Sequence, residues 1–233
     1  MIDPFARPPL TPIRFEKGDT AILCEGRDEC AVLGRLSVDW KLKPRIGICQ
    51  DGHNVREELQ QIAIQVKTQQ LAMIGLVFDA EGDRDKRTTS LQRGLKGAGL
   101  PVPSAPMRLK KARIGDADVS TAFPINPHGE KTGSIESYFI PQVRASDRWQ
   151  CIEKLLKCYR SQAPTKVAKE KVILRTFIAH GNGRNTGLNA AFNDQLLQWN
   201  HDSLDPMRRF LDLLRRASPV ESAKGGRRRE ATQ

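Results

Sequence analysis

The sequence has 233 residues, of which 39% are hydrophobic and 28% charged, and its formal net charge is +11. This composition excludes a disordered chain, and the length allows one α/β domain with a smaller appended region. Residues 84–113 contain nine Lys or Arg and a single acid, Asp85. Such positive charge favours a phosphate-rich partner, although a basic protein without such a partner would have the same composition.

The five cysteines include no C-x-x-C pair, which is typical of reduced thiols in a cytoplasmic protein. The first residues lack the basic segment and apolar core of a secretion signal, and no apolar run approaches the length of a membrane span. We therefore expect a cytoplasmic protein without a membrane partner.

Apolar runs alternate with helical patterns in the first half of the chain. Short apolar runs predict three buried strands at 20–26, 45–50 and 71–78. Each is followed by a helical pattern, the third of them at 86–98, and residues 116–126 supply a fourth strand. Strands that alternate with helices over short connections predict a mainly parallel sheet with flanking helices, hence an α/β fold.

The second half is expected to be mainly helical. A turn leads into a helix near Glu136, and helical patterns follow at 146–161, 165–180, 187–199 and 206–217. The ends differ in composition from the rest, with prolines at the start and Gly and Arg at the finish. The expected divisions are an arm at 1–18, an α/β domain at 19–127, a helical region at 128–217 and a flexible basic tail at 218–233.

Carboxylates gather where two of the predicted strands end. Glu25 follows the first strand, Asp79 follows the third, and Glu81 and Asp83 come after Asp79 at alternate positions. Parallel strands end at one sheet edge, where ligands of such sheets bind, so these acids are expected to lie together. Clustered carboxylates repel one another, and Mg²⁺ or Mn²⁺ would remove that cost. The pattern predicts an acidic metal site, with the alternative that Asp83 or Asp85 only caps the following helix.

Basic residues would hold the backbone of a nucleic acid at such a site. Lys110, Lys111 and Arg113 form a cluster beside the predicted fourth strand, and Arg184 lies in the Gly-rich segment 180–187. Each of these side chains can contact phosphate. A solvated face, or a plain connection between two helices, would give the same sequence pattern.

Two segments resemble a known family. "ILCEGRDE" (22–29) ends a strand in Glu-Gly, and "LVFDAEGD" (76–83) ends a later strand in spaced acids. This order resembles the Toprim domain of topoisomerases, DnaG-type primases, small ribonucleases and overcoming-lysogenization-defect nucleases, with Glu81 where Asp is usual. The resemblance covers about 19–125. The segment "GSIESYF" (133–139) and the helices up to 217 are more weakly similar to an uncharacterised bacterial family of Toprim-like proteins.

The resemblance implies a Toprim-like, mainly parallel four-stranded sheet and metal-dependent hydrolysis of DNA or RNA, as in bacterial phage-defence systems. It implies catalytic and metal-binding roles for Glu25 and Asp79, Mg²⁺ binding by Glu81, and a further cation ligand at Glu136, in the G-x-x-E segment that begins at Gly133. The alternative is a catalytically silent module that binds nucleic acid or an ATPase partner. An exposed sheet edge or the helical region would allow a homo-oligomer.

Overall fold

The computed structural model describes residues 19–39, 45–48, 55–68, 71–159, 166–182 and 187–217. The chain forms two compact units. Unit 1 comprises Met1–Phe78, Thr88–Pro124 and Met207–Gln233, and unit 2 comprises Asp79–Arg87 and Ile125–Pro206. The predicted arm and tail lie outside the described residues.

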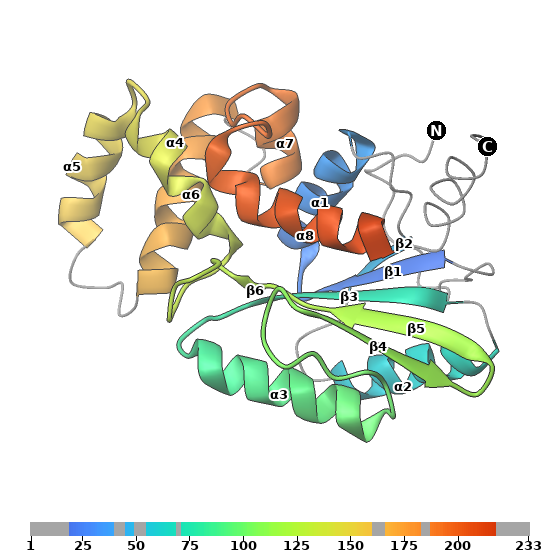
Figure 1. Cartoon of the computed structure of the whole chain (residues 1–233). Coiled ribbons are helices and arrows are strands. Elements are labelled where there is room, and N and C mark those ends of the chain that lie inside the picture. The colour runs from blue at the N-terminus through green and yellow to red at the C-terminus, as the bar shows by residue number, and fades with distance from the viewer. Residues whose placement is uncertain are drawn as a thin grey trace, which may run out of the picture. The chain divides into compact units, whose positions relative to one another are not determined.

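Unit 1 is built on a mainly parallel sheet (Figure 1). Its strands stand in the order β2 (Arg45–Ile48), β1 (Asp19–Cys24), β3 (Leu71–Asp79), β5 (Ala117–Ala122) and β4 (Leu109–Ile114). The short strand β6 (Ile125–Asn126), which pairs with β3 off this path, is assigned to unit 2 together with Asp79, the last residue of β3. β1 runs parallel to β2 and β3, and β3 runs parallel to β5. Among the described strands of the main path, the edge strand β4 runs antiparallel to β5. The prediction of an α/β fold with a mainly parallel sheet is confirmed.

The burial of the strands explains which of them the sequence predicted. Residues 21–24 of β1 and 73–79 of β3 are all buried. A strand that is covered on both faces needs a continuous apolar run, and such a run stands out in the sequence.

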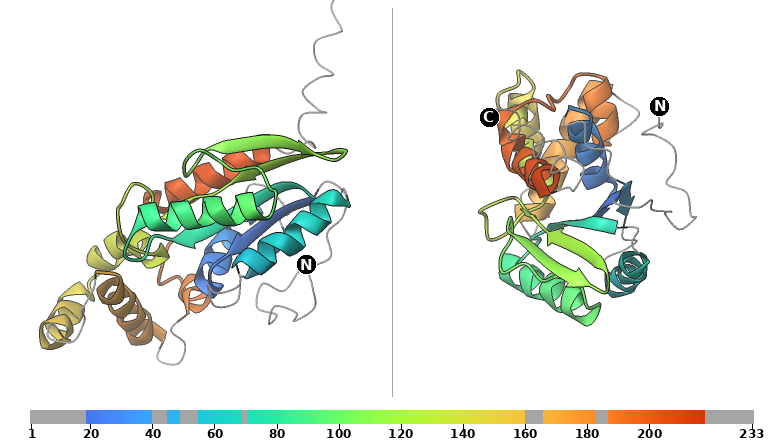
Figure 2. Two further views of the ribbon diagram at one scale, coloured as in Figure 1. Left: turned by 90° about the horizontal axis from the view of Figure 1, so that it is seen from below. Right: turned by 45° about the vertical axis from the view of Figure 1, so that its right-hand side comes forward.

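Helices cover both faces of this sheet (Figures 1 and 2). α2 (Val55–Lys67) and α3 (Arg84–Gly97) lie on one face, and α1 (Arg27–Asp39) and α8 (Asp205–Ala217) lie on the other. α8 packs closely on β3, because a Cβ atom on Gly75 would lie 3.0 Å from Phe210 Cζ and 3.1 Å from Leu214 Cδ1. α8, the last helix in the described part of the chain, therefore completes the core of unit 1.

The predicted count of four strands was too low. β4 was not predicted, because its residues 110–113 are all exposed and lack apolar alternation. Such a strand is recognisable only through its pairing with β5. The predicted fourth strand, 116–126, divides into β5 and β6, with Phe123 and Pro124 between them.

Unit 2 contains mostly short helices. They are η1 (Ile135–Tyr138), α4 (Ile140–Arg144), α5 (Trp149–Tyr159), α6 (Lys166–Asn182), α7 (Leu188–Asn193) and η2 (Asp202–Leu204). The helix predicted at 187–199 was too long, because the chain leaves helical geometry at Gln195, whose φ is 56°. Within the described residues, every helix is too short or too polar to cross a membrane.

Candidate acidic site

Glu25 follows β1 in unit 1. Its backbone N–H donates to the carbonyl of Val77 at 3.1 Å, and the strand register pairs Cys24 with Val77. β1 and β3 therefore end at the same edge of the sheet, as the sequence predicted. A Cβ atom on the following Gly26 would lie 2.9 Å from Oε2 at the end of the Glu29 side chain, which would have to shift. Glu29 is itself buried, which the sequence did not indicate.

Three further acids, Asp79, Glu81 and Glu136, belong to unit 2. The backbone after Asp79, which ends β3, is hydrogen-bonded to residues 126–133: the Ala80 N–H donates to the Asn126 carbonyl at 2.8 Å. Glu81 and Gly133 exchange both of their N–H···O bonds, at 2.8 and 2.9 Å. These bonds fix the backbone at Glu81.

The bridge between Glu81 and Gly133 requires unusual backbone on both sides. Glu81 has φ 49°, a left-handed conformation that costs a non-glycine residue about 1 kcal/mol or more. Gly133 has φ 136°, and a Cβ atom there would lie 2.6 Å from Pro127 Cδ. Only glycine fits this position, so the backbone conformation explains the glycine of the G-x-x-E segment.

Asp79 is buried, being only 4% exposed, and its carboxylate is hydrogen-bonded. Its Oδ1 accepts hydrogen bonds from the backbone N–H of Ile135 at 3.0 Å and from Asn126 Nδ2 at 3.4 Å. Asn126 is oriented in turn, because its Oδ1 accepts from the Tyr138 hydroxyl at 3.3 Å. The Tyr138 oxygen accepts from the His128 N–H at 2.8 Å. These hydrogen bonds orient the Asp79 carboxylate.

The acidic site also contains a buried carboxylate, Glu136, and a positive charge, Lys171. Glu136 is 4% exposed, and its Oε2 has no hydrogen-bond partner in the described part of the chain. The Lys171 ammonium on α6 lies 3.2 Å from Glu81 Oε1. Burial lowers the pKa of Lys171, but Glu136, Glu81 and Asp79 together outweigh it and raise the pKa above its usual 10.5. Three carboxylates thus act on one ammonium group.

Glu170, beside Lys171 on α6, contacts the same part of unit 2. Its carboxylate accepts a hydrogen bond from the hydroxyl of Ser137 on η1. The two α6 residues lie 33 and 90 residues along the chain from their partners Ser137 and Glu81. They belong to an ordinary helical pattern, so no local signal in the sequence indicated them.

Asp83 caps a helix in this structure. Its Oδ1 accepts from the backbone N–H groups of Asp85 and Lys86, each at 3.0 Å, at the start of α3. The hydrogen bond from Lys86 is the main cause that lowers the pKa of Asp83. This is the geometry of a helix N-cap, the alternative that the sequence left open beside a metal-binding role.

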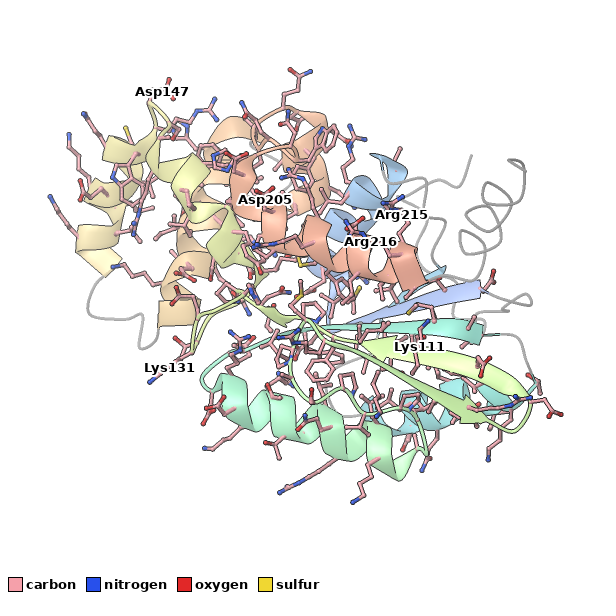
Figure 3. All side chains as sticks on the ribbon, in the orientation of Figure 1. Lys111, Lys131, Asp147, Asp205, Arg215 and Arg216 are labelled. Atoms are coloured by element: carbon pink, nitrogen blue, oxygen red, sulfur yellow. The ribbon has the colours of Figure 1, made fainter. Side chains whose placement is uncertain are left out.

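The predicted phosphate-binding residues lie in different places. Lys110, Lys111 and Arg113 are all exposed on β4 of unit 1, and Figure 3 labels Lys111. Arg113 lies 4.0 Å from Asp116, so part of its charge is balanced locally. Arg184 lies outside the described residues.

The oxygen donors of unit 2 suit a hard cation such as Mg²⁺. Among the described residues, no three His, Cys, Asp or Glu side chains form a group that could hold a metal ion by itself. Mg²⁺ usually needs only one or two carboxylates, together with waters and substrate phosphate. Asp79 and the buried Oε2 of Glu136, which has no hydrogen-bond partner among the described residues, match that smaller requirement.

A family model described as "Protein of unknown function (DUF3226)" matches residues 19–216. The chain belongs to this family. The DUF3226 match begins at the first residue of β1 and ends within α8, so it includes Glu25, the acids of unit 2 and Lys171. No curated protein and no solved structure matches the chain.

Proposed function

We propose that this DUF3226 protein is a divalent-cation-dependent hydrolase of phosphodiester bonds in DNA or RNA. The supporting observation is the buried Oε2 of Glu136, which has no hydrogen-bond partner in the described residues. A buried polar oxygen without a partner costs free energy, and a bound cation with its waters would remove that cost. The Toprim resemblance points to the same chemistry and stays a prediction.

The hydrogen bonds and burial of the acids in unit 2 suggest which of them would bind the metal ion. Asp79, held by Ile135 and Asn126, and Glu136 would bind Mg²⁺ or Mn²⁺, and Glu81 would join them from its fixed backbone. The bound cation would stabilise charge on the phosphate oxygens and make water a better nucleophile. The hydrogen bonds to Asp79 would keep its carboxylate ready for the cation.

Glu25 is proposed to transfer a proton in the reaction, and this role rests on the resemblance alone. The resemblance also implies metal binding by Glu25, and an E25Q variant separates the two roles. It should keep cation binding and lose hydrolysis if Glu25 transfers a proton, and it should lose both if Glu25 also binds the cation. The exposed cations Lys110 and Lys111 on β4 are proposed to contact the phosphate backbone, which would make binding strongly salt-dependent.

The test is incubation of the purified protein with plasmid, single-stranded DNA and RNA, in the presence of Mg²⁺, Mn²⁺ or a chelator. We expect cleavage that requires the cation and is lost in E136Q. The matched control is E130Q, which changes an exposed glutamate of the 126–133 segment. Cleavage that persists in the chelator, or is equal in E136Q and E130Q, would contradict the proposal.

One observation favours a second candidate, the catalytically silent module. The Lys171 ammonium already balances part of the charge on the three acids. A silent module should bind neither Mg²⁺ nor Mn²⁺ tightly, which calorimetry measures directly. The ATPase partner and the phage-defence setting stay predictions from the resemblance.

A further inference from the structure

Lys171 was not part of the predicted site, yet its ammonium interacts with three of the acids predicted for that site. It is 3.2 Å from Glu81 Oε1, and the buried carboxylates of Glu136 and Asp79 also act on it. We propose that Lys171 is a resident counter-ion that competes with divalent cations for the acidic site, so that cation binding displaces it from Glu81. This inference rests on the proposed function.

The charges explain why the two cations would compete. Lys171 and a divalent ion are both attracted by the same carboxylates, and they repel each other at short distance. A hydrogen bond from the ammonium and a bond to a metal ion would both use the lone pairs of Glu81 Oε1 at close range, so each weakens the other. The ammonium therefore lowers the affinity of the site for a metal ion.

The exposure of the partners indicates which of them moves. The side chains of Lys171 and Glu81 are both 42% exposed, whereas Asp79 and Glu136 are 4% exposed. A lysine has a long flexible stem and can turn its ammonium into water without burying a charge. Ion pairs at this exposure are weak, so the bond between Lys171 and Glu81 can be broken at small cost.

The two roles that Lys171 could have predict opposite effects on metal affinity. If Lys171 only holds the fold, removing its charge should weaken cation binding or leave it unchanged. If Lys171 competes with the cation, removing the charge should strengthen binding, while the metal-free protein should lose stability because its carboxylates then repel one another.

The experiment is titration of the full chain with Mn²⁺ by calorimetry, on wild type, K171M, K171R and K169M. Lys169 is an exposed lysine two residues earlier on α6, so K169M removes the same charge elsewhere. We expect K171M to bind Mn²⁺ about tenfold more tightly or better, and K171R and K169M to stay within about twofold of wild type. Thermal unfolding without metal should show a lower melting temperature for K171M and a larger shift on adding Mn²⁺.

The outcomes separate this inference from the proposed function. If wild type binds Mn²⁺ and K171M binds it equally or more weakly, the counter-ion role is wrong and the proposed function stands. If neither protein binds Mn²⁺, both are wrong. If only K171M binds, Lys171 takes the place of the cation permanently, which supports the counter-ion role and favours the silent module. K171Q replaces K171M in the same titration if the methionine variant does not fold.

Discussion

The Asp79 carboxylate accepts a hydrogen bond from the backbone N–H of Ile135, 3.0 Å away and 56 residues later in the chain. A backbone donor is set by the fold and not by the side chain that it belongs to. The contact therefore ties the end of β3 to the start of η1, the segment that carries Glu136. Because this hydrogen bond needs only an accepting oxygen, whereas binding of a cation needs the negative charge, the two contributions of Asp79 can be tested separately.

An Asp79→Asn variant should keep the fold and lose the cation. The amide oxygen of asparagine can still accept from Ile135 N–H, but the negative charge is gone. We expect an unchanged far-ultraviolet circular dichroism spectrum and Mn²⁺ affinity reduced by about 100-fold or more. Calorimetry measures the affinity, with E130Q as the control. An affinity equal to that of wild type would show that Asp79 does not bind the metal ion.

Gly133→Ala should destabilise unit 2 and also shift the backbone of Glu81, to which Gly133 is hydrogen-bonded. The new methyl group would lie 2.6 Å from Pro127 Cδ at a φ of 136°, so the chain must shift. We expect a loss of about 1–3 kcal/mol in the free energy of unfolding. Gly129→Ala is the matched control, because Gly129 also has positive φ, 88°, but nothing lies within 4 Å of its added Cβ. Equal losses in urea unfolding of the two variants would show that strain alone, and not the contact with Pro127, decides the effect.

Substitutions of Asp83 distinguish a helix cap from a metal ligand. Serine caps helices nearly as well as aspartate, whereas alanine does not. If Asp83 only caps α3, Asp83→Ser should keep both the melting temperature and the Mn²⁺ affinity, and Asp83→Ala should lower the melting temperature alone. A weaker Mn²⁺ affinity in the serine variant would give Asp83 a place among the ligands.

The sequence predicted those parts of fold and site that depend on local pattern. Strands β1 and β3 could be predicted because each is a continuous apolar run. The acids at their ends could be predicted because they follow these runs directly in the sequence. β4 was missed because residues 110–113 are exposed and three of the four are charged. Lys171 was missed because its relation to Glu81 spans 90 residues and depends on how α6 packs. No periodicity in one sequence reports such a contact.

The carboxylate of Asp212 on α8 should stabilise unit 1 in a pH-dependent way. Its Oδ1 lies 2.9 Å from Arg215 Nη2 and its Oδ2 lies 2.6 Å from Arg216 Nη2, and both arginines are labelled in Figure 3. The hydrogen bond from Arg215 is the main cause that lowers the pKa of Asp212 below 3.8, against a smaller opposing effect of burial. A carboxyl whose pKa is lower in the folded state stabilises the protein above its unfolded-state pKa, and this contribution is lost as the pH falls through the folded-state value.

We therefore expect Asp212→Asn to lose about 0.5–1 kcal/mol at neutral pH, since the pairs are partly exposed. Urea unfolding of wild type and D212N should differ by this amount above pH 3.8 and converge below it. A difference that stays constant down to the lowest pH at which the protein folds would show that packing, and not charge, is lost.

The most direct measurement of the central claim is anomalous diffraction from a crystal of the protein soaked in Mn²⁺. We expect a manganese peak beside the carboxylates of Asp79 and Glu136, with the Lys171 ammonium no longer 3.2 Å from Glu81 Oε1. The absence of any peak at millimolar Mn²⁺, with Lys171 still paired to Glu81, would contradict a cation site in unit 2.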